Sequence, residues 1–199
     1  MGGIGSGKSF VADLFARQGC LAIHADQQVQ EAYRDRAVLG ALRDWWGEGA
    51  FLATGEVNRK AIAAIIFSDP SERARLEHLL HPWIAQRRDE LMSRTSGDIS
   101  IRAYVWDTPL LAEVGLDRHC DALVFVESPR AVRLARLGQS RGWGEQELER
   151  RENLQWPLDR KREIAHYVVD NSADAEVVQH QVKNLLSRII NGIARCPVE

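Results

Sequence analysis

The residues best suited to chemistry stand at the start of the chain, in the segment MGGIGSGKSF. Gly2, four further residues and then Gly7-Lys8-Ser9 fit the phosphate-binding pattern G-x-x-x-x-G-K-[ST]. Glycines let a backbone take positive φ and approach a ligand closely. The N–H groups of such a loop converge on an anion at the positive end of the next helix. The pattern predicts a site for the phosphates of ATP over Gly3, Ile4, Gly5, Ser6, Gly7, Lys8, Ser9 and Phe10.

Two side chains of this segment have separate tasks in a phosphate loop. Lys8 supplies a mobile positive charge for the β- and γ-phosphates, and Ser9 a hydroxyl for Mg²⁺. The following residues, KSFVADLFARQG, place apolar side chains such as Val11 and Leu14 on one helical face and end at Gly19. A merely flexible glycine-rich terminus would not need this helix, so the context favours a working loop.

Length and composition limit the possible classes of protein. The chain has 199 residues, 45% of them hydrophobic and 27% charged, as in an ordinary globular domain. The formal net charge of −2 gives no case for binding nucleic acid or an anionic membrane. Cys20, Cys120 and Cys196 are odd in number and lack a paired spacing, which favours reduced thiols and a cytoplasmic location. No apolar run approaches 18 residues, so we expect no membrane span.

Apolar runs that alternate with amphipathic segments predict an α/β fold with a parallel sheet flanked by helices. The stretch from about 26 to 97 is helical throughout and too long for one crossover, so we expect an appended helical subdomain, broken or kinked at Pro82. Residues 1–25 and 98–199 then form the core, with a mobile lid over about 138–160. The expected strands are 20–25, 101–107, 122–128 and 166–171.

The order of short motifs along the chain is specific. They read GGIGSGKS (2–9), HAD (24–26), GEVNR (55–59), FSD (67–69), LEHLLHP (76–82), DTPLLAE (107–113), RENLQ (151–155), Lys161 and YVVDNS (167–172). In this order and spacing the chain resembles the dephospho-CoA kinases, a family of P-loop kinases. The resemblance implies phosphoryl transfer from ATP, with Mg²⁺, to the ribose 3′-hydroxyl of the small molecule dephospho-coenzyme A. It also implies a monomer or small homo-oligomer.

The resemblance implies a role for five side chains. Asp26 orients and deprotonates the acceptor hydroxyl, caps the following helix, or does both. Asp107 holds Mg²⁺ together with the Ser9 hydroxyl and lies near the substrate, or is only a turn residue. His81 lies on the substrate side, or packs in a helix kink. Lys8 and a lid arginine, Arg141, neutralise the reacting phosphates.

The remaining arginines near the lid are harder to assign. Arg151 is a second candidate for the phosphates. Of the other arginines in or beside this segment (Arg133, Arg136 and Arg150), we expect most to be solvated and paired with glutamates at helical spacing. Gly142 and Gly144 would let the segment move.

Four positions depart from the family pattern: His24 and His166 replace aspartates, Gln30 an arginine and Phe10 a threonine. The strand that usually precedes a phosphate loop is also absent, so we expect a natural chain that starts earlier. In the present chain we expect a gap in the sheet between the strand ending at Asp107 and the one starting at Ala122. Two alternatives stay open: a kinase for another small acceptor, and an inactive nucleotide-binding paralogue.

Overall fold

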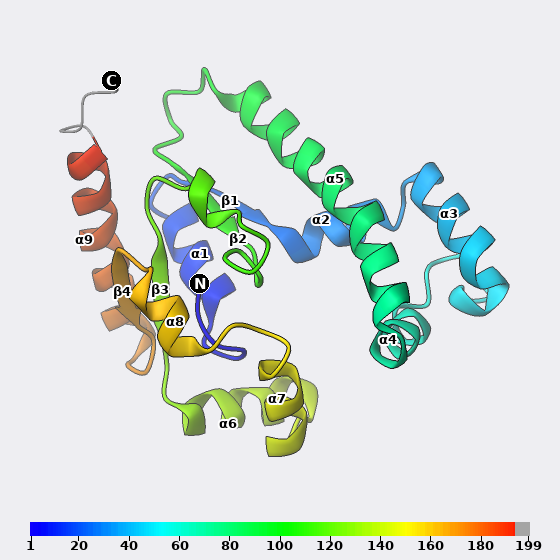
Figure 1. The fold of residues 1–199 in the computed structure, drawn as a ribbon. Helices are drawn as coiled ribbons and strands as arrows, with labels where there is room; N and C mark the ends of the chain where they lie inside the picture. Colours follow the sequence, from blue (N-terminus) through cyan, green and yellow to red (C-terminus); the bar gives the residue numbers. More distant parts are fainter. Residues whose placement is uncertain (194–199) are drawn as a thin grey trace. The chain divides into compact units, whose positions relative to one another are not determined.

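The computed structural model describes residues 1–193, which divide into two compact units (Figure 1). The first unit contains residues 1–23 and the chain from residue 99 onward, and the second contains His24–Asp98. The elements around the first unit are α1 (Lys8–Ala16), β1 (Leu21–His24), β2 (Tyr104–Asp107), η2 (Asp117–His119), β3 (Val124–Glu127), α6 (Arg130–Arg141), α7 (Glu145–Glu152), α8 (Leu158–Glu163), β4 (Tyr167–Asp170) and α9 (Ala175–Ile193). The second unit holds α2 (Ala25–Ala32), α3 (Arg36–Trp46), η1 (Gly47–Ala50), α4 (Arg59–Ser68) and α5 (Pro70–Thr95).

The four expected strands are all present, each four residues long, and they form two separate pairs. β1 pairs with β2, and β3 pairs in parallel with β4 from Val124–Tyr167 to Glu127–Asp170. No ladder joins β2 to β3 among the described strands, so the expected gap between them is confirmed. Beside β3 lies the N-terminal segment: Gly2 bridges Val126 in parallel, and the Val126 N–H donates to the Met1 carbonyl at 2.8 Å.

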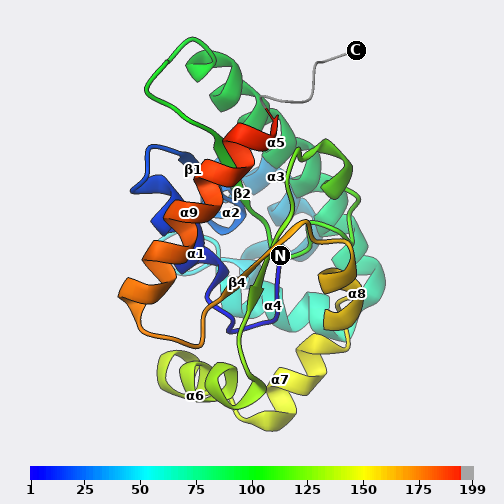
Figure 2. The same cartoon turned by 90° about the vertical axis from the view of Figure 1, so that its left-hand side faces the viewer.

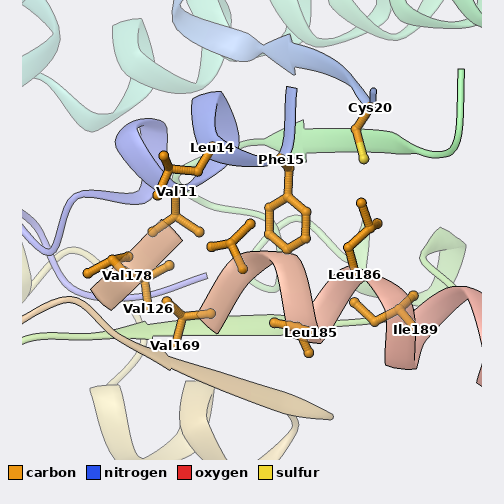
Figure 3. Close-up of a cluster of buried hydrophobic side chains, with 11 residues drawn as sticks. Val11, Leu14, Phe15, Cys20, Val126, Val169, Val178, Leu185, Leu186 and Ile189 are labelled. Atoms are coloured by element: carbon orange, nitrogen blue, oxygen red, sulfur yellow. The ribbon is translucent and has the colours of Figure 1, made fainter. Parts of the chain in front are cut away.

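The core of the first unit lies between the two strand pairs and the helices α1 and α9. The apolar face expected for the first helix is buried, and α9 packs against both α1 and β4 (Figure 2). Figure 3 shows the side chains that meet there: Val11, Leu14, Phe15, Cys20, Val126, Val169, Val178, Leu185, Leu186 and Ile189. Each buried aliphatic side chain contributes about 1.5–3 kcal/mol, so this cluster is the main support of the sheet and of the loop before α1.

The second unit has its own core, and short polar side chains fix where its helices begin. Asp35 accepts hydrogen bonds from the first N–H groups of α3, and Asn58 and Asp69 do the same for α4 and α5. Asp69 also accepts a hydrogen bond from the Ser71 hydroxyl. This bond and the bonds from backbone N–H groups lower the pKa of the Asp69 carboxyl. The motif residues Asn58 and Asp69 are therefore helix caps.

The break expected at Pro82 is wrong, because α5 runs without interruption from Pro70 to Thr95. A proline inside a helix removes one hydrogen bond but does not end the helix when both sides are held. Leu76 and Leu80 are buried before it, and Trp83 and Ile84 pack against the same cluster after it. Tertiary packing thus overrides the local preference.

Candidate active site

The loop before α1 takes positive φ at several glycines, a backbone conformation that favours glycine. Gly5 has φ +78° and Gly7 φ +87°, and Gly7 leads directly into α1 at Lys8. A Cβ on Gly7 would lie 2.2 Å from Nδ2 of Asn171, and one on Gly5 would lie 2.9 Å from the Arg133 carbonyl. The loop is therefore packed tightly at its back.

Side chains from α6 and from the end of β4 bind the loop carbonyls. Nδ2 of Asn171 donates to the Ser6 carbonyl at 2.7 Å, and Arg136 approaches the same oxygen at 3.5 Å. Arg136 also donates to the Asn171 carbonyl at 2.9 Å, and Nη1 of Arg133 donates to the Ile4 carbonyl at 3.1 Å. These protein donors hold the loop carbonyls, and the loop leads directly into the start of α1, where the first N–H groups of a helix lack intrahelical partners.

The Lys8 ammonium lies against the loop itself. Its Nζ donates to the Gly3 carbonyl at 2.9 Å and to the Gly2 carbonyl at 3.2 Å. A compact ammonium on a flexible stem can exchange these neutral acceptors for charged phosphate oxygens. Lys8 is thus placed at the loop, as its position in the motif predicts.

Two oxygen-bearing side chains of the first unit fit a magnesium ion by their chemistry. Ser9 is exposed in the first turn of α1, and Asp107 is the last residue of β2. Magnesium in kinases takes few protein oxygens and completes its shell with water and substrate phosphates. Among the residues described, no group of three or more His, Cys, Asp or Glu side chains gathers.

The expected lid arginine is exposed at the end of α6. The guanidinium carbon of Arg141 lies 4.9 Å from the ring centre of Trp143, and that of Arg151 lies 4.1 Å from the same ring. Gly142, between α6 and α7, has φ +68° and open space around it. Glu147 pairs with Arg151 at 2.5 Å, and hydrogen bonds from Arg150 and Arg151 lower the pKa of this carboxyl to about 2.

Asp26 and His81 belong to the second unit. The expectation that Asp26 caps a helix is wrong: His24 is the N-cap residue of α2, and Asp26 lies exposed within its first turn. The alternative of a packed histidine in a kink is also wrong, because His81 is exposed on an unbroken helix.

The sequence analysis does not assign the contacts that two side chains, Asn171 and Arg133, make with the phosphate loop. Asn171 stands in the quoted motif YVVDNS, and that motif was the available signal for it. Arg133 belongs to the group of arginines that we expect to be mostly solvated, but its side chain is 4% exposed. Arg133 lies four residues before the buried Leu137, hence on the same face of α6, and that spacing could have revealed it.

Two of the departures from the family pattern are accommodated by local contacts. Phe10 is half-buried and packs against the core cluster beside α1. The ring Nδ1 of His166 accepts a hydrogen bond from the Leu123 N–H at 3.0 Å, as a carboxylate could. Neither residue disturbs the loop.

Within the described part of the chain, neither Cys20 nor Cys120 forms a disulfide, and burial raises the pKa of the Cys20 thiol. Cys196 lies outside the described residues. None of the helices over residues 1–193 is long and apolar enough to cross a membrane.

Comparisons with known proteins agree with the motif order. The family model of dephospho-CoA kinases matches residues 1–176. The chain is 36% identical to the dephospho-CoA kinase of Syntrophotalea carbinolica, over 96% of this chain and 91% of the relative, and 33% identical to that of Corynebacterium glutamicum, over 94% and 96%. Among solved structures, TT1252 from Thermus thermophilus matches with a TM-score of 0.80 and 28% identity over 94% of each chain. The dephospho-CoA kinase from Campylobacter jejuni shares the fold, with a TM-score of 0.68 and 17% identity over 96% of each chain. The chain belongs to the dephospho-CoA kinase family.

Proposed function

We propose that this protein transfers the γ-phosphoryl group of ATP to the ribose 3′-hydroxyl of dephospho-coenzyme A, giving coenzyme A and ADP. The observation that carries the proposal is the loop 2–9, whose Ile4 and Ser6 carbonyls are held by side chains while Lys8 stands beside it. Family membership supplies the acceptor. The alternatives of another small acceptor and of an inactive paralogue have no support in the comparisons.

Phosphoryl transfer needs positioning and neutralisation of charge more than covalent chemistry. In this proposal the loop N–H groups and the start of α1 bind the phosphates, and Lys8 leaves the Gly2 and Gly3 carbonyls to bind phosphate oxygens. Arg141 is exposed beside Gly142, and in this proposal it reaches the transferring group when the lid closes. These groups offset the negative charge on the oxygens of the reacting phosphates.

The acceptor hydroxyl must lose its proton as the new P–O bond forms. We assign Asp26 as the group that orients this hydroxyl and receives the proton, since a carboxylate in that motif position suits the task. We assign His81 to the binding of dephospho-coenzyme A. Ser9 and Asp107 would hold Mg²⁺ when it is bound, and the ion would supply additional positive charge near the phosphates.

The proposal is tested by following ADP production with ATP and Mg²⁺ in the presence and absence of dephospho-coenzyme A. We expect turnover that depends on the acceptor, and Lys8→Ala should nearly abolish it while thermal melting stays unchanged. Lys60→Ala, at the start of α4 in the second unit, is the matched control and should remain active. ATP binding without acceptor-dependent turnover would favour the inactive paralogue. Turnover only with other alcohols would favour a kinase for a different acceptor. Cytoplasmic location and a monomeric or small oligomeric state stay predictions.

A further inference from the structure

Arg133 is a buried cation that contacts the phosphate loop and the lid helix through the same nitrogen. Its Nη1 donates to the Ile4 carbonyl at 3.1 Å and to Oε1 of Glu152 at 2.5 Å. The Arg133 side chain is 4% exposed and that of Glu152 is 20% exposed. The guanidinium also limits the space beside the loop, because a Cβ on Gly3 would lie 2.8 Å from Nη1.

The helix α7 is held on α6 by ion pairs at both of its ends; Figure 1 shows where the two helices lie. Arg130 of α6 pairs with Glu145, the first residue of α7, at 2.7 Å and with Glu152, the last, at 2.5 Å. Between them Leu148 is fully buried. Only the Glu152 end continues to Arg133 and from there to the loop, so the two ends of α7 differ in what they reach.

The Arg133–Glu152 pair makes the position of α7 and the shape of the loop depend on each other. Removing the Glu152 carboxylate would leave a buried guanidinium without its counter-ion, which is costly because little water can replace it. Arg133 would then have to shift toward solvent or another anion. Either movement takes its Nη1 away from the Ile4 carbonyl and loosens the loop at the residue before Gly5.

We propose that Glu152 is a positioning residue for ATP binding, acting through Arg133 to hold the phosphate loop and to couple it to the lid helix α7. The proposal rests on the proposed function only in taking ATP as the ligand of the loop. The ion pair of Arg133 and Glu152 does not follow from the quoted motifs, because Arg133 lies outside all of them. Arg130, which touches Glu152 but not the loop, stabilises α7 without this effect.

The experiment compares Glu152→Gln with Glu145→Gln. Both substitutions remove one carboxylate of α7 that pairs with Arg130, and only the first removes the partner of Arg133. The probe is a non-hydrolysable ATP analogue with Mg²⁺, and its Kd is measured for each protein alongside KM and kcat. We expect Glu152→Gln to raise Kd and the KM for ATP by at least about fivefold, a usual size for coupling between sites, with kcat changed much less. Glu145→Gln should leave both near wild type.

A double-variant cycle makes the route explicit. Arg133→Gln alone should weaken analogue binding, and adding Glu152→Gln to it should weaken binding little further, because the two residues act in series. If Glu152→Gln does not fold, Glu152→Asp, which keeps the charge but shortens its reach, should show the same rise in Kd. Equal Kd values for the Glu152 and Glu145 variants, or additive effects in the cycle, would overturn the proposal. The Kd for the ATP analogue is measured without acceptor. This test can therefore be interpreted even if the protein does not phosphorylate dephospho-coenzyme A.

Discussion

The Lys161 ammonium lies 2.6 Å from Oε1 of Glu113, and their side chains are 1% and 13% exposed. Gln155 accepts a hydrogen bond from the same ammonium at 3.0 Å, and the Trp156 N–H donates to Oε1 of Glu113 at 3.0 Å. The pair joins the end of the DTPLLAE segment to α8. Two motif residues with no role assigned from sequence thus form a buried structural ion pair.

Breaking this pair should destabilise the protein strongly. Lys161→Met leaves the Glu113 carboxylate buried without compensation, so we expect a loss of about 3–5 kcal/mol in the free energy of unfolding, measured by urea denaturation. Adding Glu113→Gln should recover part of it. Arg162→Met, which removes the exposed pair with Glu127, should cost at most about 1 kcal/mol. Similar losses for Lys161→Met and Arg162→Met would contradict the assignment.

Replacing the proposed base should lower turnover selectively. Asp26→Asn keeps the size of the side chain but cannot accept the proton, so kcat should fall about 10²–10⁴-fold while the Kd for ATP changes little. Asp44→Asn, an exposed carboxylate on α3 of the same unit, is the control and should be fully active. Near-normal kcat in the Asp26 variant would reduce this residue to a favourable charge at the start of α2.

A methyl group at Gly7 should distort the phosphate loop and weaken ATP binding. Gly7→Ala forces a side chain into positive φ and places Cβ 2.2 Å from the Asn171 amide, so ATP affinity should fall by more than about tenfold in a direct binding measurement. Gly40→Ala is the matched control: it lies within α3 with open space around it, and it should raise stability by roughly 0.5–1 kcal/mol without affecting ATP. Unchanged ATP affinity in the Gly7 variant would count against a phosphate site here.

The lid arginine should act on the transition state more than on binding. Arg141→Ala should lower kcat by about 10²–10³-fold, the usual effect of removing one charge-stabilising donor, with a smaller change in the KM for ATP. Arg150→Ala, exposed on α7 and paired with Glu147, should change kcat less than twofold. Equal kcat values for the two variants would remove Arg141 from the reaction.

The ion pair between Arg133 and Glu152 should make stability depend on acid pH. Burial raises the pKa of the Glu152 carboxyl, but hydrogen bonds and charges from Arg133 and Arg130 more than offset this, so the pKa lies below its ordinary value of 4.5. A carboxyl with a lowered folded-state pKa contributes stability that is present above that ordinary value and is lost as the pH falls through the lowered one. The difference in Tm between wild type and Glu152→Gln should therefore be constant near pH 6 and shrink below about pH 4.5. A difference that stayed constant into acid would show that Glu152 does not act through its charge.

The local pattern of the sequence was sufficient to predict the strands, the first helix and the phosphate loop. The spacing of Gly7, Lys8 and Ser9 and the apolar face of α1 depend on neighbours in the chain, and the same holds for the four strands. Such features follow from residue type and short-range geometry. The family also follows from sequence, because ordered motifs do not require coordinates.

What the tertiary structure decided is how distant residues share burial and charge. Whether Pro82 breaks α5 depended on packing at Leu80 and Ile84, not on proline alone. Whether Arg133 is solvated depended on the loop and on Glu152, which come from other parts of the chain. The free energy of a charge changes with its surroundings far more than with its sequence neighbours. For that reason the positions of Lys8 and Asn171 in motifs could be read from the sequence, but their hydrogen bonds to the loop could not.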